Sequence, residues 1–150
     1  TEYCDVDLLV LSSRRGGYSV KVIVEVEEAN ITPIQVCGKF LASALSQYFI
    51  HKRKGKGIAM SDSVLFIQVL DISGLKKDKT AKLEQWKNLE RSIQAVIPIK
   101  GSRINRYRLL YGDTDHFAPD GMRRRELRDL IREFLSHGQL ALRVVESVSP

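Results

Sequence analysis

The chain has 150 residues, of which 43% are hydrophobic and 28% are charged. These proportions are typical of a globular domain and exclude a disordered or fibrous chain. No apolar run approaches the roughly 20 residues that cross a bilayer, and the N-terminus lacks the pattern of a secretion signal. We therefore expect one domain over residues 1–150, with no membrane partner.

Charge is unevenly distributed along the chain, whose formal net charge is +6. Residues 1–50 carry four basic and six acidic side chains, whereas residues 51–100 carry eleven basic and five acidic ones. An acidic first third followed by basic segments favours a carboxylate site beside a surface that binds a polyanion. The two cysteines, Cys4 and Cys37, stand among apolar residues, which indicates buried free thiols and a cytoplasmic protein.

Hydrophobic patterning predicts strands and helices in the order ββαβαβα, followed by a short strand. Gly16 and Gly17 mark a hairpin turn, and Thr32 followed by Pro33 marks a helix start. In chain order, the expected elements are strands over 4–11 and 18–27, a helix over 33–51, a strand over 63–70, a helix over 81–97, a strand over 104–111, a helix over 122–136 and a short strand over 140–146.

This order predicts an α/β fold with a mixed central β-sheet flanked by helices. Its core is expected over about residues 4–70, with a helical and basic extension over about 71–150. Trp86 stands at a core position of its helix, which favours packing over base stacking. The arginines of the helix over 122–136 alternate with acidic residues at helical spacing, which predicts an exposed face held by salt bridges.

Acidic residues gather on the first two predicted strands. Because side chains alternate across a strand, Asp5 and Asp7 share one face of the first strand, and Glu25 and Glu27 share one face of the second. If the hairpin pairs with these faces aligned, four carboxylates converge at the ends away from its turn. The alternative is a solvated sheet face that is merely lined by acidic side chains.

Clustered carboxylates repel one another, and a divalent cation is the usual way to neutralise them. Mg²⁺ prefers carboxylates, carbonyls and water, with substrate phosphate completing its shell. We therefore predict a Mg²⁺ (or Mn²⁺) site suited to phosphodiester hydrolysis, in which the metal activates water. Lys39 follows Gln35 by about one helical turn, so it is expected either near Glu27, where it adds positive charge, or as a solvated surface lysine.

These residues resemble the PD-(D/E)xK nuclease superfamily, whose restriction-endonuclease-like core has a hairpin with Asp on one strand and Glu-x-Lys on the next, followed by a helix and another strand. The corresponding pieces are Asp7 in CDVDLLV and Glu25-Val26-Glu27 in VIVEVEE, followed by the helix over 33–51 and the strand over 63–70. The resemblance implies that Asp7 and Glu25 hold the metal together with the main-chain carbonyl of Val26. Asp5 is the competing candidate for the first ligand.

The chain departs from the family pattern at the lysine. Glu27 stands at that position, as in a minority of restriction enzymes, and some members carry the lysine on the following helix, where Lys39 would fit. The resemblance implies that Glu27 is an additional ligand or orients the attacking water, and that Lys39 stabilises the charged transition state. No Pro precedes the first Asp, and the chain starts at the first expected strand rather than at the family's leading helix.

Basic segments elsewhere in the chain are candidates for binding nucleic acid. Residues 52–57, KRKGKG, form a flexible loop in which Lys and Arg beside Gly can approach phosphates closely. A solvated charged loop is the alternative. The residues predicted to bind nucleic acid are Lys52, Arg53, Lys54, Lys56, Arg103 and Arg106.

The sequence therefore predicts a Mg²⁺-dependent endonuclease that hydrolyses DNA phosphodiester bonds. One alternative is a catalytically inactive, nuclease-like module that binds nucleic acid. Another is a protein interaction or assembly domain whose carboxylate face is only solvated. RNA stays open as a substrate, and a small nuclease that cuts both strands would often work as a homodimer.

Overall fold

The computed structural model describes residues 4–28, 31–50, 55–75, 79–137 and 142–146. Its strands are β1 (Leu8–Arg14), β2 (Gly17–Glu27), β3 (Tyr48–Ile50), β4 (Gly57–Asp71), β5 (Ile104–Gly112) and β6 (Leu142–Glu146). Its helices are α1 (Pro33–Leu45), α2 (Lys79–Val96), α3 (Thr114–Phe117) and α4 (Met122–Ser136). None of these helices combines the length and the apolar character that a bilayer crossing requires.

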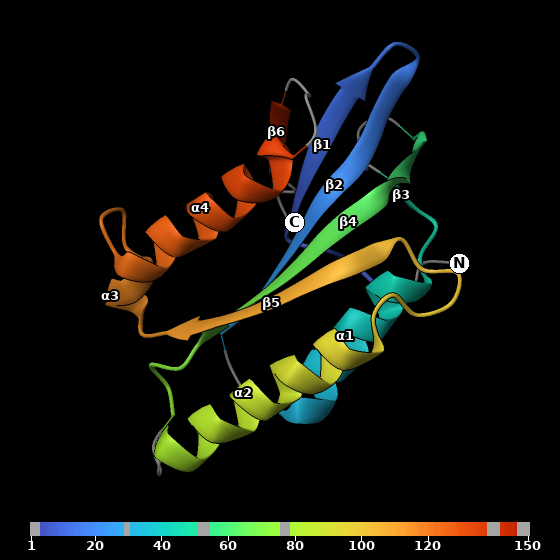
Figure 1. The fold of residues 1–150 in the computed structure, drawn as a ribbon. Helices are drawn as coiled ribbons and strands as arrows, with labels where there is room; N and C mark the ends of the chain where they lie inside the picture. The colour runs from blue at the N-terminus through green and yellow to red at the C-terminus, as the bar shows by residue number, and fades with distance from the viewer. Residues whose placement is uncertain (1–3, 29–30, 51–54, 76–78, 138–141, 147–150) are drawn as a thin grey trace.

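The strands form a curled, mixed sheet with helices on both sides (Figure 1). Its order is β3-β4-β2-β1-β6, and β5 also pairs with β4. β1 and β2 form an antiparallel hairpin, whereas β2, β4 and β5 run parallel to one another. Parallel neighbours need a crossover connection, and α1 and α2 lie in the two crossovers. This arrangement confirms the predicted α/β fold with a mixed central sheet flanked by helices.

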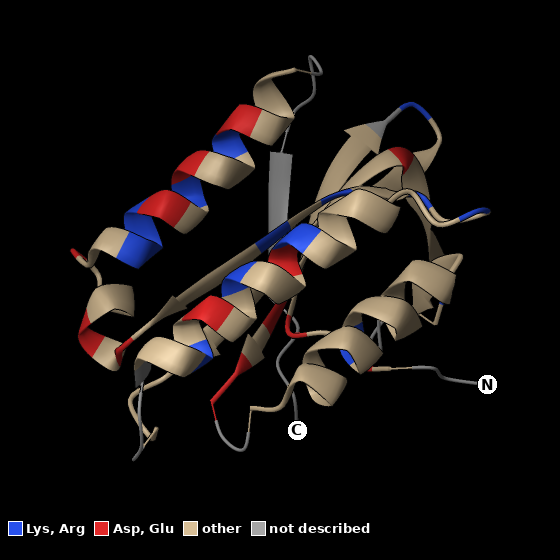
Figure 2. Ribbon diagram, turned by 60° about the horizontal axis from the view of Figure 1, so that its bottom comes forward, with Lys and Arg blue, Asp and Glu red and all other residues tan. Residues whose placement is uncertain are grey.

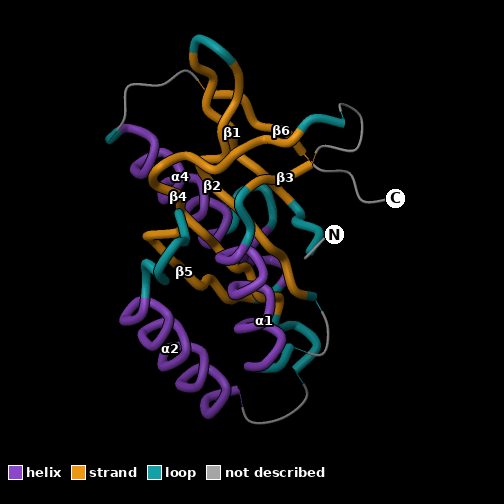
Figure 3. The backbone as a smooth tube through the Cα atoms, turned by 90° about the vertical axis from the view of Figure 1, so that its right-hand side faces the viewer, coloured by secondary structure: helices purple, strands orange, loops and turns teal. Residues whose placement is uncertain are grey.

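Each face of the sheet has its own hydrophobic core. α1 and α2 lie together on one face (Figure 3), where Phe40 and Trp86 pack against strand residues such as Ile23. α4 covers the opposite face, where Leu135 packs against residues such as Val24. β2 therefore lies between two cores, and its alternate side chains point into one or the other.

The β1–β2 hairpin has a tighter turn than the sequence predicts. β1 continues to Arg14, and the turn is centred on Gly16, whose φ of +109° suits glycine. The Ser12 hydroxyl lies 2.9 Å from that of Ser19, which lies 2.8 Å from that of Ser61. These cross-strand hydrogen bonds satisfy hydroxyls that would otherwise favour a turn, so the serine segment continues the strand.

Helix α1 ends at Leu45, earlier than the sequence predicts. The Ser46 hydroxyl donates to the Ala42 carbonyl at 2.9 Å, and the next residues pair with β4 as β3. Phe49 thereby enters the core on the α1 side. The reason is tertiary, because pairing with β4 satisfies the backbone of an aromatic and β-branched segment that suits a strand.

The start of α1 is fixed locally by a capping box between Thr32 and Gln35. The Thr32 hydroxyl accepts the Gln35 N–H at 3.3 Å, and Gln35 Oε1 accepts the Thr32 N–H at 3.0 Å. Replacing Thr32 by Ala is expected to lower the free energy of unfolding by about 1 kcal/mol, because helix N-terminal N–H groups lose their acceptor. Urea unfolding of Thr32→Ala beside Gln85→Ala, at an exposed position of α2, measures this. Equal urea midpoints in the two variants would contradict it.

The second half of the chain follows the sequence prediction closely. β5 begins where expected, α4 has the predicted bounds, and Trp86 is fully buried on α2. Between the strand predicted over 104–111 and the helix predicted over 122–136 lies the short helix α3, where His116 Nδ1 accepts the Asp113 N–H at 2.9 Å. The last strand, β6, pairs antiparallel with β1 and so extends the sheet beyond the hairpin.

Candidate functional site

Asp7 and Glu25 come together across the β1–β2 hairpin. The antiparallel register pairs Leu8 with Val24, so the residues next to them, Asp7 and Glu25, lie opposite each other on one face. The main chain holds Asp7 in place, because the Val26 N–H donates to Asp7 Oδ2 at 2.7 Å. Sheet pairing thus places two of the predicted metal ligands side by side.

The Glu25 side chain is buried beneath α1 and is only 1% exposed. Burial raises the pKa of Glu25, the Lys39 ammonium opposes this, and the Asp7 carboxyl adds to it, which gives a pKa of about 8. A side-chain hydrogen bond between the Glu25 and Asp7 carboxyls also favours the protonated form of Glu25. A solvated acidic sheet face, the alternative that the sequence allows, is therefore wrong for Glu25.

Lys39 reaches the same place from the second turn of α1. Its Nζ lies 2.6 Å from Glu27 Oε1 and 3.4 Å from Glu25 Oε2. Burial disfavours the charged ammonium, but its hydrogen bond to Glu27 and the charge of Glu25 raise the pKa of Lys39. Because Lys39 contacts both glutamates and its side chain is only 37% exposed, the alternative of a purely solvated surface lysine is wrong.

We call Asp7, Glu25, Glu27 and Lys39 the carboxylate cluster. With every group ionised, its three carboxylates exceed its single ammonium in a partly buried place where like charges repel strongly. Either a proton on Glu25 or an added cation relieves this imbalance. The cluster is therefore a place where a proton and a cation compete.

The carboxylate cluster offers a metal ion two carboxylate ligands, Asp7 and Glu25. The described part of the chain contains no group of three His, Cys, Asp or Glu side chains placed to hold a metal ion. Asp7 and Glu25 supply two carboxyl groups that lie within hydrogen-bond distance of each other. Mg²⁺ keeps several waters and often takes only one or two carboxylates, so such a set fits it. Asp5, the competing candidate, is exposed.

The predicted basic residues do not gather at the carboxylate cluster. Lys56 precedes β4, and Arg103 precedes β5 and pairs with Asp62 at 2.8 Å. Glu25 pairs in register with Gln68, near the other end of β4. Arg103 lies beside Val64, only four residues or roughly 13 Å of strand from Gln68, whereas Lys56 lies farther away, at the start of β4. Outside the described residues lie Lys52, Arg53 and Lys54.

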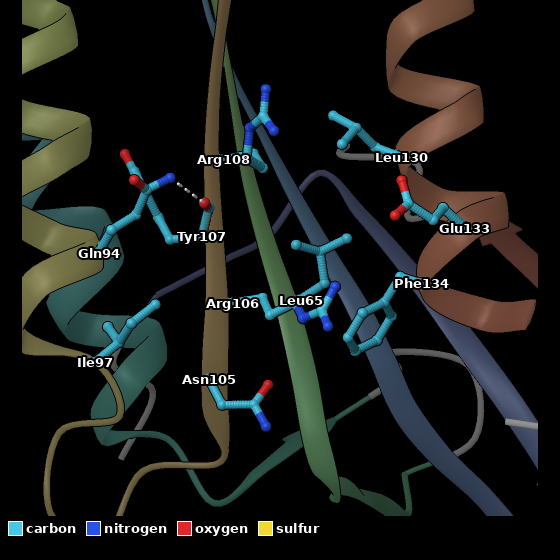
Figure 4. Close-up of a pocket in the computed structure, with 10 residues that line it drawn as sticks. All are labelled: Leu65, Gln94, Ile97, Asn105, Arg106, Tyr107, Arg108, Leu130, Glu133 and Phe134. Carbon is cyan, nitrogen blue, oxygen red and sulfur yellow. Dashed lines mark hydrogen bonds between the residues drawn. The ribbon is translucent and has the colours of Figure 1, made fainter. Parts of the chain in front are cut away.

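Arg106 lies on the α4 side of the sheet, in a cavity of about 340 Å³ between α2, β5 and α4 (Figure 4). Its guanidinium carbon is 5.8 Å from the centre of the Phe134 ring. In the same cavity, Arg108 pairs with Glu90 at 3.3 Å and with Glu126 at 3.7 Å. Arginines alternate with Asp and Glu along α4 (Figure 2), as predicted for a salt-bridged face. Arg106 is thus on the opposite face from the cluster.

Sequence reasoning missed two buried polar residues beside the cluster, Gln68 and Tyr107. Gln68 Nε2 donates to the Val36 carbonyl of α1 at 3.1 Å, and Gln68 Oε1 accepts the Tyr107 hydroxyl at 2.5 Å. A signal for Gln68 is present in the sequence, because it is the one polar residue in the apolar run over 64–70. A polar side chain in a buried strand needs partners, and the partners come from elements distant in sequence.

The carboxylate cluster can do three things chemically. Asp7 and Glu25 can hold a cation, Glu25 can take up or release a proton near neutral pH, and Lys39 can place a positive charge beside a bound anion. These abilities follow from geometry and burial alone. Comparisons with protein-family models, with curated proteins and with solved structures find no match for this chain.

Proposed function

We propose that the protein is a Mg²⁺- or Mn²⁺-dependent endonuclease that hydrolyses DNA phosphodiester bonds at the carboxylate cluster. The observation that carries this proposal is the Glu25 carboxyl, which is buried against the Asp7 carboxyl. Burying such a carboxylate is unfavourable unless a cation or a proton compensates it. Carboxyls perturbed by burial and by a charged neighbour are typical of functional sites.

The order of the elements also supports a restriction-endonuclease-like core. Asp7 precedes β1, Glu25 and Glu27 lie on the antiparallel partner β2, α1 follows, and β4 then runs parallel beside β2. The PD-(D/E)xK nucleases, which the sequence resembles, have this succession of strand, strand, helix and strand. Lys39 supplies from α1 the positive charge that most of that family carries on the second strand.

Each residue of the cluster has a role in this proposal. A metal ion held by Asp7 and Glu25, with the Val26 carbonyl as a further ligand, would activate water and polarise the phosphate. Glu27 would orient the attacking water or add a ligand. Lys39 would stabilise the negative charge that develops on the phosphate, because a fixed cation in a partly dry site acts strongly on such charge.

The position of the basic residues sets a length for the proposed substrate. A duplex that reaches both the carboxylate cluster and Arg103 has to span roughly 13 Å, which is about four base pairs at roughly 3.4 Å each, and one that also reaches Lys56 has to be longer. Contacts to phosphates at the basic end would give affinity that falls with salt and does not depend on sequence. Because one cluster cuts one strand, cleavage of both strands would require two copies, which fits a homodimer.

The test is cleavage of supercoiled plasmid and of single-stranded DNA in Mg²⁺ or Mn²⁺. We expect the wild-type protein to nick DNA and Asp7→Asn to lose at least about a hundredfold in rate, because the metal loses a charged ligand. Asn keeps an acceptor for the Val26 N–H, so the variant is expected to fold. Glu84→Gln, at an exposed carboxylate of α2, is the matched control and is expected to cut normally.

One observation favours the inactive nucleic-acid-binding module as a second candidate. The Lys39 ammonium already pairs with Glu25 and Glu27, and this neutralisation needs no metal. DNA binding that weakens steeply with salt, without cleavage in either metal, would establish that module and overturn the nuclease. Neither cleavage nor binding would instead favour a protein interaction or assembly domain.

A further inference from the structure

A chain of buried hydrogen bonds connects β5, β4 and α1 behind the carboxylate cluster. The Tyr107 hydroxyl donates to Gln68 Oε1 at 2.5 Å, and Gln68 Nε2 donates to the main-chain carbonyl of Val36 at 3.1 Å. Gln68 and Val36 are completely buried and Tyr107 is 2% exposed. Through its amide donor and its amide acceptor, Gln68 of β4 therefore links α1 with β5.

This row of hydrogen bonds ends next to Glu25 and Lys39, two members of the carboxylate cluster. Gln68 is the register partner of Glu25 on the neighbouring parallel strand, so the two side chains share one face of the sheet. Val36 lies on α1 about one helical turn before Lys39, whose Nζ contacts Glu25 and Glu27. The hydrogen bonds thus tie the part of α1 that carries Lys39 to the strand beside Glu25.

Apolar packing alone does not fix the position of α1 so narrowly. The Phe40 ring meets the rings of Phe66 and Tyr107 edge-on, at centroid distances of 5.8 Å and 5.4 Å. Edge-to-face ring pairs have a preferred geometry but tolerate a small slide of the helix over the sheet, whereas a hydrogen bond weakens steeply when its partners shift. The Gln68 amide therefore adds a directional restraint on how α1 sits along and above β4.

We propose that Gln68 and Tyr107 are positioning residues of the carboxylate cluster. They hold α1 at the height and register that bring the Lys39 ammonium between Glu25 and Glu27, and they touch neither substrate nor metal. This inference rests on the proposed function in one respect, the effect of Lys39 placement on the cleavage rate. Its structural part, the placement of Lys39, can be tested without any activity.

The first experiment reads the position of Lys39 directly, by the ¹H–¹⁵N NMR signal of its ammonium and by amide hydrogen exchange of α1. We expect Gln68→Met and Tyr107→Phe to shift or broaden the ammonium signal and to speed exchange in α1 by about tenfold or more, while exchange in α4 stays unchanged. Gln94→Met is the matched control. In the wild type, Gln94 Nε2 donates to the Tyr107 carbonyl at 3.1 Å. The Gln94→Met variant therefore loses one glutamine hydrogen bond to Tyr107 but no hydrogen bond to α1.

The second experiment reads the consequence for cleavage. We expect Gln68→Met to lower kcat by about tenfold to a hundredfold with KM for DNA unchanged, because a displaced group loses effective placement rather than binding. In a Lys39→Met background, Gln68→Met is expected to cost nothing further, since both changes remove the same contribution.

Three outcomes decide the matter. If Gln68→Met and Tyr107→Phe leave the Lys39 signal and α1 exchange as they are in Gln94→Met, the positioning role is overturned. If they change both readouts while the wild-type protein does not cleave DNA, the positioning role stands and the proposed function fails. Additive losses in the Lys39→Met background would also overturn it, because they would show that Gln68 acts on cleavage independently of Lys39.

Discussion

Replacing Glu25 by Gln is expected to abolish metal-dependent cleavage and, in metal-free buffer, to make the folded protein more stable above about pH 8. The pKa of Glu25 is about 8 in the folded state, against an ordinary value of 4.5. Proton binding by the folded state therefore stabilises it fully below about pH 4.5, and this contribution is lost as the pH rises to about 8. Gln resembles the protonated form and does not ionise, so its stability does not fall in that window.

The size of this effect follows from linkage. Each pH unit of the window corresponds to about 1.4 kcal/mol, so several kcal/mol separate the wild type from Glu25→Gln at alkaline pH. Urea unfolding at pH 5, 7 and 9 in the presence of a chelator measures it, with Glu84→Gln as the exposed control. Parallel pH curves for wild type and Glu25→Gln would show that Glu25 does not titrate in this window. Added Mg²⁺ should stabilise the wild type at pH 9 and leave Glu25→Gln unchanged.

Replacing Lys39 by Met is expected to reduce the cleavage rate by about a hundredfold to a thousandfold. Lys39 Nζ lies 2.6 Å from Glu27 and 3.4 Å from Glu25, so it places a positive charge beside the proposed reacting phosphate. Loss of a fixed charge that stabilises a transition state has an effect of this order. Lys39→Arg keeps the charge but changes its shape and reach, and we expect it to restore only part of the rate.

Single-turnover cleavage with saturating metal measures this second effect. Lys87→Met is the matched control, because Lys87 also pairs with a glutamate, Glu84, but on the exposed surface of α2. A wild-type rate in Lys39→Met would show that Lys39 is only a counter-ion for Glu25 and Glu27. In that variant the pKa of Glu25 is expected to rise further, since Lys39 is the group that lowers it.

The two variants separate the catalytic and the structural parts of the cluster. Glu25→Gln removes a ligand and a buried charge together, so cleavage falls while alkaline stability rises. Lys39→Met removes the compensating charge, so both cleavage and alkaline stability are expected to fall. A protein in which the cluster is merely a structural ion pair would show the stability changes and no metal-dependent activity.

Several features of the fold could be predicted from the sequence because their causes are local. The start of α1 is determined by neighbouring residues, because Thr32 and Gln35 form a capping box within one helical turn and Pro33 occupies the first helical position. The bounds of α4 and the burial of Trp86 follow from helical periodicity of apolar side chains. The facing of Asp7 and Glu25 follows from strand alternation once the hairpin is recognised.

Other features depend on partners that are distant along the chain. The end of α1 is set by the pairing of β3 with β4, and the tight hairpin turn by hydroxyl contacts that reach Ser61 on β4. The basic segment that follows α1 in sequence leads to the far end of β4, because α1 crosses back over the sheet. Adjacency in sequence was therefore a poor guide to adjacency at the site.

The sequence by itself determined the order of the elements other than β3 and α3, the start of α1 and the set of acidic residues that share a strand face. Only the tertiary structure decided that Glu25 is buried, that Lys39 meets both Glu25 and Glu27, and that Gln68 and Tyr107 brace α1 behind them. The reason is physical. Capping and periodicity act within a few residues, whereas burial, charge pairing and strand register arise only when separate elements pack together.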